Sequence, residues 1–310
     1  MDRAQLGGNG LPFPPGTLLH IAARQSERAR QAHVLAPFAT TEQYVLDGGV
    51  RFVVRRAESL ARKAAGPRDA SGEATQANPF IDYDPSLFVT DISATHICLL
   101  NKFPVMAHHL LIVTRTMESQ EDVLTLEDFE ALCTCLADLD GLGFYNGGRL
   151  AGASQPHKHL QVVPLPLAGE GPPLPIEAAL AAARPGGGVD AVPGLPFRHA
   201  LIWLEPQLFD RPPLAAAQVH RAYDDLLAAV FAADGTPLPA RRQPGPYNLL
   251  VTRRWMLLVP RSSEQFAAIP VNALGYAGSF FIWTDEQAEA LLAHGPMTIL
   301  AAVGRPRSQR

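Results

Sequence analysis

Short apolar segments separated by turn residues constrain the fold of this 310-residue chain most strongly. They are rich in residues that favour strands, and they predict strands at 50–56, 87–92, 95–101, 108–113 and 197–205 and a hairpin over 247–260 that turns at Arg253-Arg254. Helices are expected at 17–33, 125–140, 214–233 and 284–295, the second and fourth opened by capping-box patterns. Because the strands cluster and do not alternate regularly with helices, the sequence predicts an α+β fold with mainly antiparallel sheets.

A stretch rich in proline and glycine, residues 164–196, interrupts this pattern. It contains eight prolines and the run Gly186-Gly187-Gly188, a composition typical of a linker or a long excursion. A chain of 310 residues has room for about two domains. We therefore predict one domain over residues 1–190, with the linker starting near 164, and a second domain over 191–310.

Composition excludes several classes of protein. With 47% hydrophobic and 18% charged residues, the chain can build a core, and its net charge of −4 argues against a general nucleic-acid binder while allowing a site for a small nucleotide. Phe266–Thr284 carries no charge, but Pro270 and Gly275 interrupt it, so we expect a buried strand, turn and strand rather than a membrane span. Three cysteines and an N-terminus without the pattern of a secretory signal predict a cytoplasmic location.

The chemically informative segment is GASQPHKHLQVVP, at 152–164. Its apolar end predicts a strand entered from a loop, and side chains on a strand alternate between two faces. His157, His159 and Gln161 would then share one face and form a polar strip. Such a strip is unusual in a core strand, because every buried polar group needs a hydrogen-bond partner.

Three interpretations of the histidine pair remain open on this pattern alone. The first is a zinc site, with His96, His108 or His109 as a third ligand. The second is nucleophilic catalysis, in which a neutral imidazole attacks phosphorus and holds the group as a phosphoramidate. The third is structural, with both imidazoles satisfied by neighbouring groups.

The neighbouring residues favour an anion site. The Gly152-Ala153-Ser154 turn lets the backbone approach a ligand and offers N–H donors and a hydroxyl, and Asn146 begins a second permissive turn. The Asn101-Lys102 pair follows an apolar strand and can bring a positive charge to a phosphate. The segment contains no carboxylate or thiolate, which a zinc site would favour.

These motifs resemble a known family. GASQPHKHLQ, with YNGG, LLNKFPV and HHLLIVT before it, closely resembles the diadenosine tetraphosphate phosphorylases, also called ATP adenylyltransferases. They belong to the histidine-triad superfamily, beside galactose-1-phosphate uridylyltransferase. The similarity continues through NPF, FRHALIWLE, YNLLVT, LVPRS and NALGYAGS, and so covers about 45 to 285. It implies a histidine-triad-like antiparallel sheet with flanking helices and a C-terminal ATP adenylyltransferase domain.

The resemblance also implies a reaction. His159 would attack the α-phosphorus of diadenosine tetraphosphate and release ATP, and phosphate would then take the adenylyl group to give ADP, reversibly. A transferase or hydrolase acting on another nucleoside polyphosphate or on adenylyl sulfate, a zinc hydrolase, and a nucleotide sensor without turnover are the alternatives. The nucleotides and phosphate would be the partners of a monomer or homodimer that binds neither nucleic acid nor membrane. We expect Mg²⁺ to be carried by the nucleotide, and we expect no structural zinc.

Matching positions assign the individual roles. Gln161 would bond a phosphate oxygen, and His157 would hold neighbouring groups by hydrogen bonding. The substrate-binding positions would be Lys63, Asn101, Lys102, Asn146, Gly152, Ala153, Ser154, Gln155, Gln161, Asn272, Ala273 and Leu274. Ser279 and Trp283 depart from the pattern, since related sequences tend to carry a Met and a substrate-reaching Lys there. The preferred length of the phosphate chain therefore stays open.

Overall fold

A computed structural model of the chain describes residues 12–57, 78–183, 186, 188–232 and 240–307. Within these residues, one antiparallel sheet runs in the order β3-β4-β5-β7-β6-β9-β10-β8. Its strands are β3 (Phe88–Asp91), β4 (His96–Leu100), β5 (Leu110–Thr114), β6 (Gly141–Gly147), β7 (His159–Pro164), β8 (Ala200–Trp203), β9 (Tyr247–Val251) and β10 (Trp255–Pro260). The predicted α+β class with mainly antiparallel pairing is confirmed.

Two smaller sheets accompany the large one. In the first, β1 pairs with β2 antiparallel, and β2 pairs with β13 in parallel. The second is a short antiparallel pair, β11-β12. The bounds are β1 (Thr40–Asp47), β2 (Val50–Ala57), β13 (Ser279–Ile282), β11 (Gln265–Phe266) and β12 (Ile269–Pro270).

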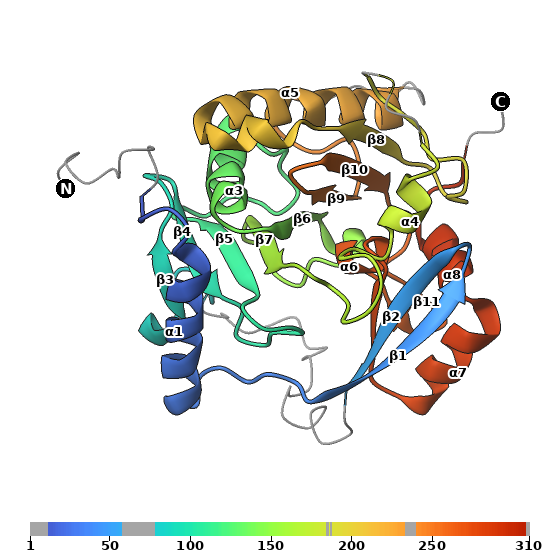
Figure 1. The fold of residues 1–310 in the computed structure, drawn as a ribbon, viewed down its shortest axis with the longest axis horizontal. Helices are drawn as coiled ribbons and strands as arrows, with labels where there is room; N and C mark the ends of the chain where they lie inside the picture. Colours follow the sequence, from blue (N-terminus) through green and yellow to red (C-terminus); the bar gives the residue numbers. More distant parts are fainter. Residues whose placement is uncertain (1–11, 58–77, 184–185, 187, 233–239, 308–310) are drawn as a thin grey trace.

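Helices cover the sheet on both faces. The α-helices are α1 (Leu18–Gln31), α3 (Leu126–Asp138), α4 (Glu177–Leu180), α5 (Pro212–Phe231), α6 (Ala273–Tyr276), α7 (Asp285–His294) and α8 (Pro296–Val303), and the 3₁₀ turns are η1 (Pro85–Leu87), η2 (Arg149–Ala151) and η3 (Pro206–Asp210). The capping boxes predicted at Thr125 and Thr284 are both present, with Asp128 and Gln287 as their third helical residues. Figure 1 shows α5 lying across α3.

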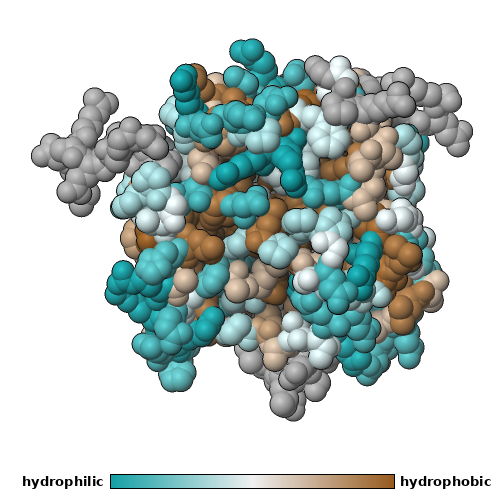
Figure 2. All heavy atoms as spheres, viewed as in Figure 1, coloured by the Kyte–Doolittle hydropathy of each residue, from teal (hydrophilic) through white to brown (hydrophobic). Residues whose placement is uncertain are grey.

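The large sheet separates two apolar layers, because successive side chains point to opposite faces. On one face, α1, α3 and α5 pack over residues such as Ile112 and Leu160. On the other face, Phe144 and Leu250 pack against β2, β13 and helices α4, α6 and α8. A smaller cluster over β4 and β5, which includes Leu111, occupies the same side as this second layer. On the face seen in Figure 2, apolar side chains lie in separate patches among polar ones.

The stretch 164–196 packs into the molecule, and this favours the long excursion over the linker, the two alternatives that its composition allowed. Leu167, Leu174, Ile176 and Val192 are buried in the second apolar layer. It is an excursion from β7 that supplies core residues before the chain enters β8. Strands from both sides of residue 190 pair directly in one sheet, at β6 and β9. The division into domains at that residue stays a prediction.

The uncharged stretch 266–284 differs from the prediction in its middle. It contains β12, helix α6 and β13, so a short helix stands where a turn was expected. Asn272 explains the difference, because its side chain accepts a hydrogen bond from the N–H of Leu274 and so caps α6. Among the described residues, no helix is both long and apolar enough to cross a membrane.

Candidate active site

The polar strip predicted on the histidine strand is present. β7 begins at His159, and both His159 and Gln161 lie opposite the face that carries Leu160. The strip lies between the apolar cluster over β4 and β5 and the larger layer over β6, since β7 pairs with β5 on one side and β6 on the other. The ring of Phe80 lies 4.9 Å from that of His159, centroid to centroid.

His159 is held in one tautomer. Its Nδ1 lies 2.8 Å from the carbonyl oxygen of His157, which only accepts, so Nδ1 carries the proton and donates it. Burial lowers the pKa of His159 to about 4, and the imidazole is therefore neutral near pH 7. Nε2 has no hydrogen-bond partner among the described residues, and its lone pair is directed away from the His157 carbonyl. A neutral imidazole with a free nitrogen is a competent nucleophile.

His157 makes the hydrogen bonds expected of a residue that organises its neighbours. Its Nε2 donates to the carbonyl oxygen of Thr114 at 2.8 Å, and its Nδ1 accepts from Nδ2 of Asn78 at 2.9 Å. Burial lowers its pKa as well. Both ring nitrogens of His157 are hydrogen-bonded, so neither is free to attack phosphorus. These bonds hold His157 in place, and its backbone carbonyl in turn orients the ring of His159.

Gln161 is oriented by a histidine from the neighbouring strand. His109, just before β5, donates from Nε2 to Oε1 of Gln161 at 2.8 Å. Nδ1 of His109 accepts from Nδ2 of Asn101 at 3.3 Å, which fixes the ring. The oxygen of the Gln161 amide is thereby engaged, and its NH₂ group is left to donate to an anion. Burial lowers the pKa of His109 to about 4, so it acts as a neutral donor.

Asn146 and the 272–274 segment meet the glycine turn in one place. Oδ1 of Asn146 accepts from the N–H of Ala273 at 2.9 Å and from Nδ2 of Asn248 at 2.8 Å. Gly152 has φ +89°, and a Cβ there would lie 2.8 Å from Cβ of Asn272. The neighbouring Asn146 and Gly152 and the distant 272–274 segment thus form one cradle, at which only glycine fits position 152.

A buried arginine, Arg261, donates hydrogen bonds to residues next to this cradle. Arg261 is 1% exposed, and it donates to Oδ1 of Asn248 at 2.6 Å and to the carbonyl oxygen of Val271 at 2.8 Å. It also donates to the carbonyl oxygen of Ala151, just before the glycine turn. One guanidinium therefore joins the backbone just before Gly152 to the backbone just before Asn272.

Most of the remaining predicted binding residues are exposed or partly exposed, one is buried, and one falls outside the described residues. Ser154 is exposed, and Gln155 and Ala153 are partly exposed on the loop that leads to His157, while Leu274 is buried in α6. Lys102 is exposed, with Nζ 5.7 Å from the centroid of the Phe103 ring. Lys63 falls outside the described residues.

The two positions that depart from the family pattern are packed against other groups. Ser279 accepts a hydrogen bond from Nη1 of Arg55 at 2.7 Å. Trp283 packs edge-on against Phe38 and against Phe281, with ring centroids 4.8 Å apart in each case. Phe38 and Arg55 line a cavity of about 360 Å³ that the loop after Asn101 also borders. Trp283 thus belongs to an aromatic group beside this cavity, and the expected lysine contact at its position stays a prediction.

Sequence reasoning missed two residues that organise the strip. Sequence reasoning offers His109 only as a zinc ligand. It lies two residues before Leu111, the cross-strand partner of Gln161, so its diagonal contact with Gln161 depends on the register of β5 and β7. Gln120, in a loop without any motif, bonds the backbone of His159. Among the described residues, no group of three or more His, Cys, Asp or Glu side chains is arranged to hold a metal ion.

Comparison with known proteins places this site in a family. A sequence model of the Ap4A phosphorylase N-terminal domain matches residues 9–182, and one of the ATP adenylyltransferase C-terminal domain matches residues 193–306. The chain belongs to the Ap4A phosphorylase family. Membership in this family makes it a nucleotidyltransferase, and the family predicted from the histidine motif is confirmed.

Yeast relatives extend the comparison over most of the chain. Diadenosine 5',5'''-P1,P4-tetraphosphate phosphorylase 2 of Saccharomyces cerevisiae is 27% identical over 296 residues, covering 87% of each protein. Protein APA1 of the same yeast is 29% identical over 219 residues, or 61% of each protein. The crystal structure of yeast Ap4A phosphorylase Apa2 in complex with Ap4A has a TM-score of 0.76 at 22% identity, covering 94% of this chain and 98% of that one. This structural likeness shows that the fold is shared.

Proposed function

We propose that the protein catalyses phosphorolysis of diadenosine tetraphosphate to ATP and ADP through a covalent adenylyl group on His159. The observation that carries the proposal is the state of that imidazole: neutral, with its proton on Nδ1 and with Nε2 free. A nucleophilic histidine needs this arrangement, and a histidine with a merely structural role would have both nitrogens engaged, as His157 has.

In the first step, Nε2 of His159 attacks the α-phosphorus, and a nitrogen–phosphorus bond forms. The bond between that phosphorus and the bridging oxygen breaks, and its electron pair leaves with ATP. A polyphosphate is a good leaving group near pH 7, so the step requires positioning and charge neutralisation more than a strong acid. The positive charge on the imidazole is stabilised by the His157 carbonyl, which accepts from Nδ1.

In the second step, an oxygen of inorganic phosphate attacks the adenylyl phosphorus. The nitrogen–phosphorus bond breaks, ADP forms, and His159 returns to its neutral state. The same in-line geometry serves both directions, so ATP and ADP would give diadenosine tetraphosphate and phosphate in reverse.

The groups around His159 suit a phosphate. The NH₂ of Gln161, left free by the bond from His109, would donate to a non-bridging oxygen in both steps. The N–H groups of Gly152 and Ala153 already donate to the carbonyls of Arg149 and Gly148, so the backbone N–H groups of Ser154 and Gln155, just after the glycine turn, would donate to the phosphate. Lys102 would meet a more distal phosphate, and Mg²⁺ bound to the nucleotide would neutralise part of the phosphate charge. The resemblance also assigns a phosphate contact to Lys63, which lies outside the described residues.

The test is chromatography of the products formed from diadenosine tetraphosphate, with and without inorganic phosphate, using wild type and His159→Ala. We expect phosphate-dependent ATP plus ADP, lost in the variant, while His20→Ala on the exposed face of α1 stays active. Formation of ATP plus AMP without phosphate would identify a hydrolase. Binding of the nucleotide with no product under either condition would identify a sensor.

A further inference from the structure

The backbone of His159 lacks a strand partner on the side of β6. β6 pairs with β7 only from Gly141↔Pro164 to Phe144↔Gln161, so this pairing stops before His159, although β6 itself continues to Gly147. The side chain of Gln120 fills this place: its Oε1 accepts from the N–H of His159 at 2.8 Å, and its Nε2 donates to the His159 carbonyl at 3.2 Å. The same Nε2 donates to the carbonyl of Asn146 at 2.9 Å. One amide thus holds the nucleophile and the cradle together.

The loop that carries Gln120, residues 118–124, is bound along the same edge. The N–H of Lys158 donates to the carbonyl of Glu118, and the N–H of Gln120 donates to the carbonyl of Pro156, both at 2.8 Å. Tyr145 Oη donates to the carbonyl of Gln120 at 2.6 Å. The start of the loop therefore pairs with the histidine motif through one antiparallel bridge, Ser119↔His157.

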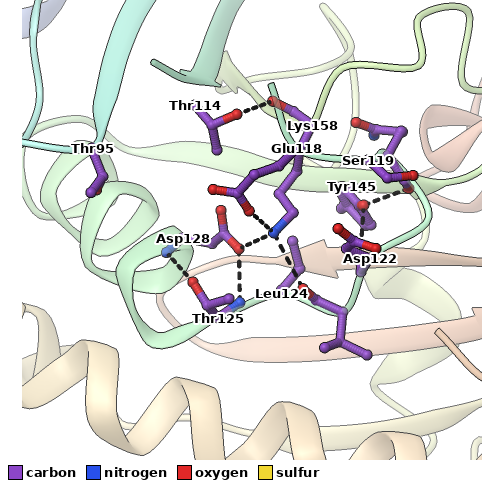
Figure 3. Close-up of polar contacts among 12 residues, drawn as sticks. Thr95, Thr114, Glu118, Ser119, Asp122, Leu124, Thr125, Asp128, Tyr145 and Lys158 are labelled. Atoms are coloured by element: carbon purple, nitrogen blue, oxygen red, sulfur yellow. Dashed lines mark hydrogen bonds and ion pairs between the residues drawn. The ribbon is translucent and has the colours of Figure 1, made fainter. Parts of the chain in front are cut away.

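Lys158 binds this loop near both of its ends, and its side chain lies on the face of the histidine motif opposite to that of His159. It is 1% exposed, and its Nζ lies 2.6 Å from Oε2 of Glu118, 3.1 Å from Oδ2 of Asp128 and 3.3 Å from the carbonyl of Val123 (Figure 3). Glu118 and Val123 stand near the two ends of the loop. Asp128 belongs to the capping box of α3, so the lysine joins both loop ends to the start of a helix.

Burying a lysine is costly unless its charge and its donors are satisfied, and here three acceptors satisfy it. A strand that only needed an apolar residue at position 158 would carry one, as it does at Leu160 on the same face. The ammonium group reaches no substrate atom, because it points away from the face that carries His159. The three acceptors of its hydrogen bonds belong to the loop and to α3.

We propose that Lys158 is a positioning residue for the nucleophile: through its ion pairs it fixes the 118–124 loop, and the loop's Gln120 then fixes the backbone of His159. The inference rests on the proposed function for the identity of the nucleophile. A displacement of about 1 Å in a reacting group can cost about 100-fold in rate. The positioning would therefore appear in the rate of adenylyl transfer more than in nucleotide affinity.

The experiment measures the single-turnover rate of His159 adenylylation by diadenosine tetraphosphate, with active sites counted by the amount of adenylyl-enzyme formed. Gln120→Met and Lys158→Met are each expected to lower the rate per active site by about 10- to 100-fold, with KM changed less than about threefold. The control is Arg253→Met, which removes donors to the carbonyls of Leu136 and Ala137 at the other end of α3. It is expected to lower thermal stability and leave the rate per active site unchanged.

A double variant separates positioning from stability. Lys158→Met alone leaves the Asp128 carboxylate buried without its cation, whereas Asp128→Asn combined with Lys158→Met removes both charges and is expected to recover thermal stability. The inference predicts that the rate stays low in the double variant. A rate per active site that returns to the wild-type value together with stability would overturn it. Absence of adenylyl-enzyme in the wild type would instead refute the proposed function, and this inference with it.

Discussion

The free energy of unfolding should fall steeply as the pH drops from about 6.5 to 4, because two site imidazoles are buried in the neutral form. Burial lowers the pKa of His109 and of His159 from the ordinary 6.5 to about 4. Between these values the unfolded chain binds a proton at each histidine and the folded chain does not, so stability is full above pH 6.5 and is lost as the pH falls. A shift of 2.5 pKa units at about 1.4 kcal/mol each amounts to about 3 kcal/mol per histidine near pH 4.

Urea unfolding followed by tryptophan fluorescence at several pH values between 7 and 4.5 measures this loss. His109→Gln and His159→Gln should each flatten the dependence by about 1.4 kcal/mol per pH unit, because each removes one differential proton. His20→Gln on α1 is the matched control, since that imidazole meets water in both states. If either site variant kept the wild-type slope, the buried neutral state of that histidine would be wrong; for His159 this would also remove the neutral imidazole that the proposed attack requires.

Three substitutions test the surroundings of the nucleophile. Gln161→Met should lower kcat by about 100-fold, because one donor to the transition-state oxygens is lost. It should also lower stability by about 1–3 kcal/mol, because the buried Nε2–H of His109 loses its acceptor. Steady-state kinetics on diadenosine tetraphosphate would decide, and an unchanged kcat would refute the role. His109→Leu frees the Gln161 amide to rotate and should lower kcat/KM by about 10-fold, less than loss of the amide itself, in the same assay. Gly152→Ala places a Cβ against Asn272 in a residue with φ +89°. It should therefore lower stability by about 1–3 kcal/mol, measured by denaturation, and raise KM for the nucleotide, measured by steady-state kinetics. Wild-type values in both measurements would contradict the cradle.

The elements that the sequence predicted well are those specified locally. The capping boxes at Thr125 and Thr284 depend on residues three positions apart, and both formed as expected. The common face of His159 and Gln161 follows from the alternation of a single strand. The hairpin β9-β10 needs only its two apolar runs and the turn between them.

The parts that could not be predicted depend on strand order and register. His109 meets Gln161 because β5 pairs with β7 in one particular register, which neither strand specifies alone. Asn146 meets Ala273 across 127 positions of sequence. Gln120 carries no motif, and its role depends on where the pairing between β6 and β7 stops. The prolines of 164–196 correctly indicated a break in regular structure. They did not reveal that the apolar residues between them are buried in the core and hold this stretch against the rest of the molecule.

The most direct test of the account is whether His159 carries an adenylyl group during turnover. The protein would be incubated with diadenosine tetraphosphate without inorganic phosphate, digested under neutral conditions and analysed by peptide mass spectrometry. The account predicts a gain of one adenylyl group on the peptide that contains His159, and release of that group as ADP when phosphate is added. Phosphate-dependent formation of ATP and ADP with no adenylyl group on any histidine would contradict the covalent route and require direct transfer to phosphate.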